Sequence, residues 1–302
     1  MTLLDKAIVR MLPAVPKPVV QLFSSRYIAG STIDDAVATV RVRNGEGKMA
    51  TIDVLGEEIT REGEARAIAQ AYCDVFGVIE REQLDSNVSV KLTGLGLDLS
   101  HDLCRENLER VVREAARFGN FVRIDMEDSS TTAETLTLYR ELRAAGFDNV
   151  GVVLQAYLRR TLDDVAALAD LKPNVRLCKG IYVEPPSIAF TDYDAVRANY
   201  VRALDALLGA GAYVGVATHD EWLIGEALER VGALDVSDYE FQMLLGVREQ
   251  RASELVAAGH RLRVYVPYGE HWYQYSLRRL QENPAMAGTI ARATVGRVLG
   301  RS

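Results

Sequence analysis

The stretch that decides the fold runs from Asn87-Val-Ser-Val-Lys91, through Arg105–Phe118, to Phe121-Val-Arg-Ile-Asp-Met126. Its two ends are short runs that contain valine, isoleucine and phenylalanine, which is typical of strands. The part between them is an amphipathic stretch of helical length. Two strands separated by a helix pair in parallel, because the helix carries the chain back across the sheet. This stretch therefore predicts one strand–helix–strand unit.

The same unit recurs from Met49 onwards, as short β-rich runs that are each followed by a longer helical run. The predicted strands are Ala50–Val54, Asn87–Lys91, Phe121–Met126, Val150–Gln155, Val175–Cys178, Tyr213–Ala217, Tyr239–Met243 and Arg263–Val266. The predicted helices include Arg105–Phe118, Thr132–Ala145, Leu162–Asp170 and Tyr193–Gly209. Eight such units in about 235 residues suit an α/β fold of the (β/α)8 TIM-barrel type, whose typical length is about 250 residues.

An open, doubly wound sheet is the alternative fold. Such a sheet more often carries a glycine-rich dinucleotide fingerprint where a helix begins. The nearest candidate is Gly94-Leu95-Gly96, which lacks the third glycine and does not open a helix. We therefore reject that fingerprint and expect the barrel.

Composition narrows the class of protein. The chain has 302 residues, of which 48% are hydrophobic, so it can bury a large core in one or two domains. Its net charge is −7, with no run of basic residues, which argues against a nucleic-acid partner. Cys73, Cys104 and Cys178 show no metal-ligand spacing and predict reduced thiols in a cytosolic setting. No apolar run reaches transmembrane length, and no signal peptide is evident.

The first 48 residues differ in character from the rest. We expect an N-terminal helical arm over residues 1–48 and the barrel over residues 49–302, with the boundary in the turn Asn44-Gly45-Glu46-Gly47. The arm has an apolar stripe formed by Leu4, Ile8, Met11 and Leu12. Such a stripe packs on its own domain or lies on a membrane surface. Packing on the barrel is the preferred interpretation.

Polar residues gather where the predicted strands end. In a barrel of this type the chemistry lies at the carboxyl ends of the strands. The residues at or just beyond these ends are Lys91, Asp125, Met126, Gln155, Arg176, Lys179, Gly180, Ile181, Tyr182, Thr218, His219, Leu244 and Tyr265. We therefore expect a site at this end of the barrel.

Several of these residues also have plain structural interpretations. Lys91 follows apolar strand residues, and we expect it to pair with a carboxylate such as Asp125. Asp128 is expected to cap the helix that follows it. His219 has the alternative of a satisfied core histidine, and its neighbour Asp220 that of a helix cap.

A short helix, His271–Asn283, follows the last predicted strand and is expected to fold over the barrel mouth. Residues three and four apart share a helix face, so Tyr275 and Glu282 flank Arg278 and Arg279. Two adjacent arginines repel each other unless an anion lies between them, and a carboxylate fits two guanidinium groups. The helix therefore indicates a site for a small carboxylate.

Eight motifs together resemble the proline dehydrogenase family, in the order that the family has them. They are Val88-Ser-Val-Lys-Leu-Thr, Ile124-Asp-Met-Glu, Leu154-Gln-Ala-Tyr, Arg176-Leu-Cys-Lys-Gly, Ala217-Thr-His-Asp, Phe241-Gln-Met-Leu, Val264-Tyr-Val-Pro-Tyr-Gly and Tyr275-Ser-Leu-Arg-Arg-Leu-Gln-Glu-Asn. The match resembles the short bacterial monofunctional type, since nothing here is long enough for an aldehyde dehydrogenase domain.

The resemblance implies a distorted (β/α)8 barrel that holds FAD non-covalently and oxidises L-proline to Δ1-pyrroline-5-carboxylate. It also implies a cytoplasmic protein that passes electrons to a membrane quinone, from the inner face of the cell membrane, and that supplies a downstream pyrroline-5-carboxylate dehydrogenase. By position, Asp125 and Arg176 would be catalytic. The cofactor would contact Met126, Gln155, Arg176, Lys179, Gly180, Ile181, Tyr182, Thr218 and His219. The substrate would contact Lys91, Leu244, Tyr265, Arg278, Arg279 and Glu282. The family often has alanine where this chain has Ile181.

Two other classes of function compete with this interpretation. One is a lyase or aldolase barrel that uses Lys91 or Lys179 as a Schiff-base amine. The other is a non-catalytic barrel that binds amino acids. A barrel fold by itself excludes neither.

Overall fold

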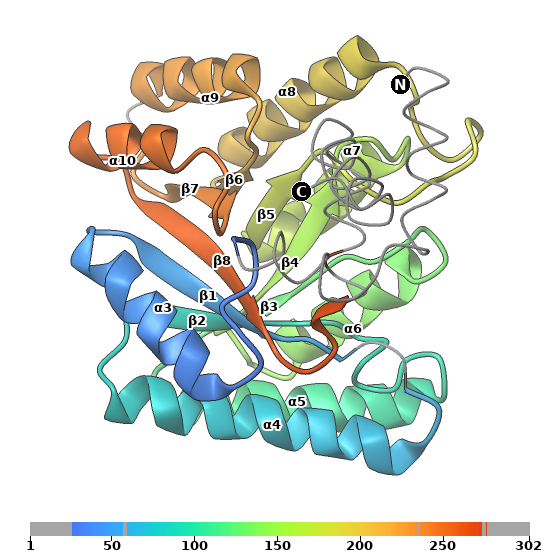
Figure 1. Ribbon diagram of the computed structural model, residues 1–302. Coiled ribbons are helices and arrows are strands. Elements are labelled where there is room, and N and C mark those ends of the chain that lie inside the picture. The colour runs from blue at the N-terminus through green and yellow to red at the C-terminus, as the bar shows by residue number, and fades with distance from the viewer. Residues whose placement is uncertain (1–25, 57–58, 235, 274–275, 277–302) are drawn as a thin grey trace, which may run out of the picture.

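The computed structural model describes residues 26–56, 59–234, 236–273 and 276 of the chain. Its strands close into one parallel barrel, in the order β1 to β8 (Figure 1). The strands are β1 (Met49–Val54), β2 (Ser86–Val90), β3 (Val122–Ile124), β4 (Val150–Gln155), β5 (Asn174–Cys178), β6 (Tyr213–Ala217), β7 (Tyr239–Leu244) and β8 (Leu262–Tyr268). The pairing of β1 with β8 closes the barrel, with Ile52 opposite Val266. The barrel predicted from the repeated unit is thus confirmed.

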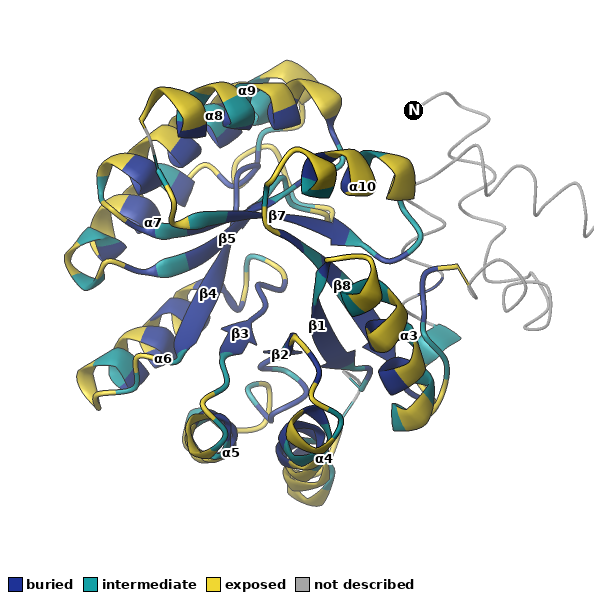
Figure 2. Ribbon diagram, turned by 90° about the vertical axis from the view of Figure 1, so that its left-hand side faces the viewer, coloured by how far each residue is buried: buried dark blue, intermediate teal, exposed yellow. Residues whose placement is uncertain are grey.

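Helices surround the barrel. They are α3 (Ile33–Gly45), α4 (Glu62–Arg81), α5 (His101–Arg117), α6 (Thr132–Ala144), α7 (Thr161–Leu168), α8 (Tyr193–Gly209), α9 (Glu221–Ala233) and α10 (Glu249–Ala257), with a short 3-10 helix, η2 (Ala169–Leu171). Each of α4 to α10 follows a strand, whereas α3 precedes β1 and packs against β1 and β8. The helices turn their buried residues toward the strands and their exposed residues outward (Figure 2). In this way α3 covers the outside of the two strands that close the barrel.

Local sequence signals explain where these helices begin. Thr32 caps α3, because its side chain accepts a hydrogen bond from the Asp35 N–H while Asp35 bonds back to the Thr32 N–H. Ser100 caps α5 through the N–H of Leu103, and Asp192 caps α8 through the N–H of Ala195. A cap of this kind typically stabilises a helix by about 1 kcal/mol.

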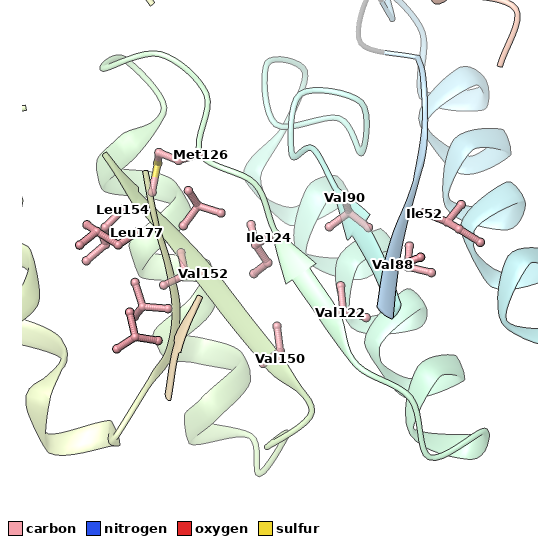
Figure 3. Close-up of a cluster of buried hydrophobic side chains, with 14 of the residues drawn as sticks. Ile52, Val88, Val90, Val122, Ile124, Met126, Val150, Val152, Leu154 and Leu177 are labelled. Atoms are coloured by element: carbon pink, nitrogen blue, oxygen red, sulfur yellow. The ribbon is translucent and has the colours of Figure 1, made fainter. Parts of the chain in front are cut away.

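An apolar layer lies between the strands and the helices. Val88, Val122 and Val150 mark it on three successive strands, and all three are fully buried (Figure 3). Each such side chain contributes roughly 1.5–3 kcal/mol through its burial. Alternate residues along a strand point to opposite faces. The strand residues next to each of these valines in the sequence therefore point into the barrel.

The interior of the barrel is polar. The guanidinium of Arg176 on β5 reaches Asp125, just after β3, and Ser89 on β2, so these bonds cross the interior between strands that are not neighbours. Gly151 and Gly215 leave room for large polar side chains. A Cβ on Gly151 would lie 2.5 Å from an Arg123 nitrogen. TIM barrels more often fill this space with branched apolar side chains.

The predicted elements agree with the structure to within a few residues. Val150–Gln155, Tyr213–Ala217 and Tyr193–Gly209 have the predicted bounds. The prediction that Asp128 caps the next helix is wrong. Thr131 is the N-cap residue of α6, and the Asp128 carboxylate instead accepts hydrogen bonds from the Ser130 N–H and hydroxyl, because it lies one turn too early in the chain.

Three expectations fall wholly or partly beyond the described ranges. The apolar stripe of residues 1–25 lies outside them, and the division into arm and barrel at residues 48 and 49 stays a prediction. Arg278, Arg279 and Glu282 of the expected final helix also lie outside. Within the residues that the structure describes, no helix is both long and apolar enough to cross a membrane.

Candidate active site

Five polar side chains meet inside the barrel at the carboxyl ends of the strands. We call them the mouth cluster: Asp53 of β1, Lys91 after β2, Asp125 after β3, Arg176 of β5 and Tyr265 of β8. The Lys91 Nζ lies 2.7 Å from Asp53 Oδ2 and 3.7 Å from Asp125 Oδ2. The Tyr265 hydroxyl donates to Asp53 Oδ2 at 2.6 Å and lies 3.3 Å from Asp125 Oδ2. The expected pair of Lys91 with Asp125 is present, but Asp53 is the closer partner.

Asp53 is fully buried beneath this cluster. It accepts hydrogen bonds from Lys91, Tyr265 and the Tyr72 hydroxyl of α4, the last at 3.1 Å. Burial raises the pKa of Asp53, Lys91 opposes the shift, and the neighbouring carboxylate of Asp125 adds to it. The negative charge of Asp53 is therefore only partly compensated, because Lys91 is shared with Asp125.

Arg176 is held along two edges of its guanidinium group. Its Nε donates to Gln242 Oε1 at 2.5 Å, and its Nη1 donates to Asp125 Oδ1 at 2.6 Å and to Ser89 Oγ at 3.3 Å. In the described part of the chain, Nη2 has no hydrogen-bond partner. A fixed cation with free N–H donors at a barrel mouth can stabilise a negative charge that develops there.

A second charged group lies at the ends of β5 and β6. Asp220 caps α9 and accepts hydrogen bonds from Lys179, Tyr193 and Arg197, the last at 2.6 Å. Burial opposes its ionisation, but Arg197, Tyr193 and Lys179 together hold the pKa of Asp220 well below its usual range. The Arg197 guanidinium also lies over the rings of Tyr193 and Trp222. Asp220 is thus a helix cap, as one interpretation of the sequence had it, and it also fixes Lys179.

Other predicted cofactor contacts lie at the carboxyl ends of β3, β4 and β6. Gln155 is buried and donates to the Glu127 carbonyl at 2.8 Å, next to the buried Met126. The Thr218 hydroxyl accepts from the Asp220 N–H. His219 Nε2 accepts from the Leu244 N–H at 3.0 Å, so this histidine joins the ends of β6 and β7.

The loop after β5 passes close to the end of β4. Gly180 has φ +106°, and a Cβ there would lie 2.0 Å from the Tyr157 ring. Only glycine fits both the backbone conformation and the space. The Tyr157 hydroxyl is buried without a hydrogen-bond partner among the described residues, while Ile181 is 38% exposed. A buried hydroxyl without a partner beside an open loop is compatible with a bound ligand.

The structure adds residues that sequence reasoning missed. Asp53 occupies a strand end like those of the other candidates, and applying the strand-end rule to the first strand would have found it. Ser89 and Gln242 bind Arg176 through the barrel interior, and which strand residues face inward cannot be told without the closed barrel. Lys91, Asp125, Arg176 and Tyr265 are brought together as expected.

The opposite end of the barrel holds a cavity of about 660 Å³, lined in part by Asp85, Arg123, Tyr213, Glu240 and Arg263. It opens at the amino ends of the strands, which in this fold serve stability rather than chemistry. Over the described ranges, no cluster of three or more His, Cys, Asp or Glu side chains could hold a metal ion.

Comparison with known proteins gives consistent matches. A family model described as proline dehydrogenase matches residues 36–292. The chain is 41% identical to Proline dehydrogenase 1 of Bacillus subtilis subsp. natto, over 89% of this chain and 90% of that protein. It is 37% identical to Proline dehydrogenase of Deinococcus radiodurans, over 88% of both. The crystal structure of proline utilization A (PutA) from Bdellovibrio bacteriovorus matches with a TM-score of 0.81 and 27% identity. That match covers 86% of this chain and 32% of PutA, so the chain spans about a third of the longer protein.

Proposed function

This chain belongs to the proline dehydrogenase family, and we propose that it oxidises L-proline to Δ1-pyrroline-5-carboxylate with FAD as its cofactor. We also propose that the electrons pass to a membrane quinone from a cytoplasmic protein that contacts the inner face of the membrane. The product would then be consumed by a pyrroline-5-carboxylate dehydrogenase.

The residues at the mouth fit a flavin. Among the described residues, Arg176 Nη2 and the buried Tyr157 hydroxyl have no hydrogen-bond partner, and Arg176, Tyr157 and the exposed Ile181 belong to β5 or to the loops that follow β4 and β5. Lys179, held by Asp220, can meet the negative charge of a diphosphate. Gln155, Met126, Gly180, Tyr182, Thr218 and His219 would complete the contacts. FAD would supply the redox chemistry by accepting a hydride, while the protein supplies orientation and electrostatics.

The substrate contacts follow from the same arrangement. Arg278 and Arg279 would bind the proline carboxylate by paired hydrogen bonds, with Glu282 beside them. Lys91, Tyr265 and Leu244 would form the wall of the pocket. Holding the carboxylate fixes the ring so that one C–H bond faces the reacting centre, which is a proximity effect.

The observation that carries this proposal is the position of Arg176. It is 8% exposed, is held by Gln242 and Asp125, and keeps Nη2 without a partner in the described chain. A cation fixed in this way stabilises negative charge without reorganising during the reaction. By contrast, Lys91 and Lys179 are each ion-paired with an aspartate, which gives no support to a Schiff-base reaction.

The visible spectrum of the purified protein tests this proposal directly. We expect a yellow protein that releases free FAD on heating and loses its flavin absorbance when proline is added without oxygen. A folded protein that cannot take up FAD, or that binds FAD but is not reduced by proline, would refute the proposal. Proline binding without dye reduction would favour the non-catalytic alternative.

A further inference from the structure

Arg176 donates a hydrogen bond from Nε to a residue that has no role in the proposed reaction. Gln242 Oε1 of β7 accepts from Arg176 Nε at 2.5 Å, and both side chains are buried. We infer that Gln242 is a positioning residue for Arg176, and that Glu240 determines which end of the Gln242 amide faces the arginine. This inference rests on the proposed function, because it concerns the same reaction.

The direction of the Gln242 amide is fixed by its second partner. Gln242 Nε2 donates to Glu240 Oε1 at 2.6 Å. A carboxylate can only accept hydrogen bonds, so the NH2 end must face Glu240 and the oxygen must face Arg176. The reversed amide would set an NH2 group against the N–H of Arg176 and an oxygen against the carboxylate. Both contacts would then be repulsive.

Glu240 is itself held firmly at the base of the barrel. Arg263 donates to it from Nε at 2.7 Å and from Nη2 at 3.1 Å, and the Tyr213 hydroxyl donates at 2.8 Å. Glu240 is buried, and its bonds keep it ionised even though burial opposes this. A chain of donors and acceptors therefore runs from Arg263 through Glu240 and Gln242 to Arg176.

The neighbouring strand leaves space for this amide. Gly215 on β6 lies beside Gln242, and a Cβ there would lie 2.4 Å from Gln242 Nε2 and 2.9 Å from its Cδ. The glycine has no positive φ that would require it for conformational reasons. The close approach of the amide is the reason that a side chain does not fit at position 215.

Losing the Gln242 acceptor would change how the guanidinium of Arg176, with its five N–H donors, is held. Gln242 occupies Nε, and Asp125 with Ser89 occupies Nη1, so Nη2 is left without a partner among the described residues. Without the acceptor at Nε, the guanidinium is held along one edge only and can tilt. A misplacement of about 1 Å near reacting atoms can cost about 100-fold in rate.

The test compares Gln242→Met with Thr51→Val. Met has a similar length but offers no strong acceptor to Nε. Thr51 is also buried in the barrel and donates to Asn87 Oδ1 at 2.5 Å, but it has no hydrogen bond to Arg176, so its variant controls for the loss of one interior bond. We expect equal FAD content and similar melting temperatures in the two variants. For Gln242→Met we expect kcat to fall by about 10- to 100-fold, while KM for proline changes less than about threefold.

Two readouts do not depend on turnover. The flavin reduction potential of Gln242→Met should be lower than that of Thr51→Val, and a crystal structure should show the Arg176 guanidinium displaced. An unmoved guanidinium, or a rate and potential equal to those of the control, would overturn the inference. If the unaltered protein is not reduced by proline, the proposed function fails instead, and the crystal structure still decides the role of Gln242.

Gly215→Ala provides a second test that keeps every polar group. Its methyl group would push the Gln242 amide away from Arg176, so kcat and the reduction potential should fall as in Gln242→Met, though by less. Should Gln242→Met not fold, this variant decides the question. An alanine variant with unaltered rate and potential would contradict the inference.

Discussion

The two ends of the barrel interior hold buried carboxylates in opposite situations. At the base, Glu240 accepts hydrogen bonds from Arg263, Tyr213 and Gln242, and these outweigh burial and lower its pKa. At the mouth, Asp53 shares Lys91 with the carboxylate of Asp125, and burial raises its pKa. Both carboxylates are almost inaccessible to solvent. Each has one cationic partner, so the difference comes from the sharing of Lys91 with Asp125 and not from depth.

This difference separates the base of the barrel from the end that holds the candidate site. At the base, Glu240 has Arg263 as a partner that it does not share with a second buried carboxylate. The mouth keeps acids that share a cation, and an arginine whose Nη2 meets no partner within the described ranges. Incomplete compensation of this kind is typical of sites that bind or transform a ligand.

The largest expected effect is on stability, from Glu240→Ala at the base. This change leaves Arg263, whose side chain is only 13% exposed, without its carboxylate, and breaking a buried ion pair costs roughly 3–5 kcal/mol. Urea denaturation should show a decrease of this size in the free energy of unfolding. Glu106→Ala removes an exposed partner of Arg66 and serves as the control, with a melting temperature close to that of the unaltered protein. Equal melting temperatures for the two variants would mean that the base is not a structural centre.

The next effect is on rate, from Arg176→Met at the mouth. Met keeps much of the stem of the side chain and removes the charge. Losing one preorganised electrostatic group typically costs about 100- to 1,000-fold in rate. We expect slower flavin reduction by proline in stopped flow and a lower reduction potential, with proline binding less affected. If rate and potential both equal those of the unaltered protein, Arg176 is structural and the contrast between the two ends is lost.

A smaller effect is expected from Arg278→Lys or Arg279→Lys. Lysine keeps the charge but cannot form the paired hydrogen bonds of a guanidinium group with a carboxylate. Loss of a buried, hydrogen-bonded charge contact costs about 2 kcal/mol or more, which is about 30-fold in proline affinity. FAD content should not change. Proline saturation that is unaltered in both variants would rule out a carboxylate clamp at these two arginines.

Sequence periodicity was sufficient for the fold and for the end of the barrel where the candidate residues gather. Val150–Gln155 and Tyr213–Ala217 were predicted to the residue, because a buried parallel strand is a short apolar run with clear ends. Lys91, Asp125 and Tyr265 were expected at one end because every strand of a parallel barrel runs the same way.

The hydrogen-bond and ion-pair partners within the candidate site could not be predicted from the sequence. Gln242 lies 66 residues from Arg176, and only the closed barrel brings the two together. Lys91 was expected to pair with Asp125, yet Asp53 lies closer, because β1 and β3 both neighbour β2 and the sequence does not say which of their carboxylates the lysine reaches. Asp128 was assigned as a cap from its residue type alone, and residue type does not determine the turn in which the helix begins.

The smallest expected effect is a difference between Glu240→Gln and Asp53→Asn in how stability depends on pH. The pKa of Glu240 is lowered by folding. Its contribution to stability is therefore present above the unfolded pKa of about 4.3 and is lost as the pH falls through the lower folded value. The pKa of Asp53 is raised by folding. Its contribution is complete below the unfolded pKa of about 3.9 and is lost as the pH rises through the folded value.

The two variants should therefore give slopes of opposite sign. Relative to Glu240→Gln, the unaltered protein should gain stability as the pH rises from about 3 to 5. Relative to Asp53→Asn, it should lose stability as the pH rises above about 4. Each slope is limited to about 1.4 kcal/mol per pH unit, because one proton is involved. Urea denaturation across this range measures both differences. Slopes of the same sign would show that the two carboxylates are compensated alike, and the distinction between the base and the mouth would then have no electrostatic origin.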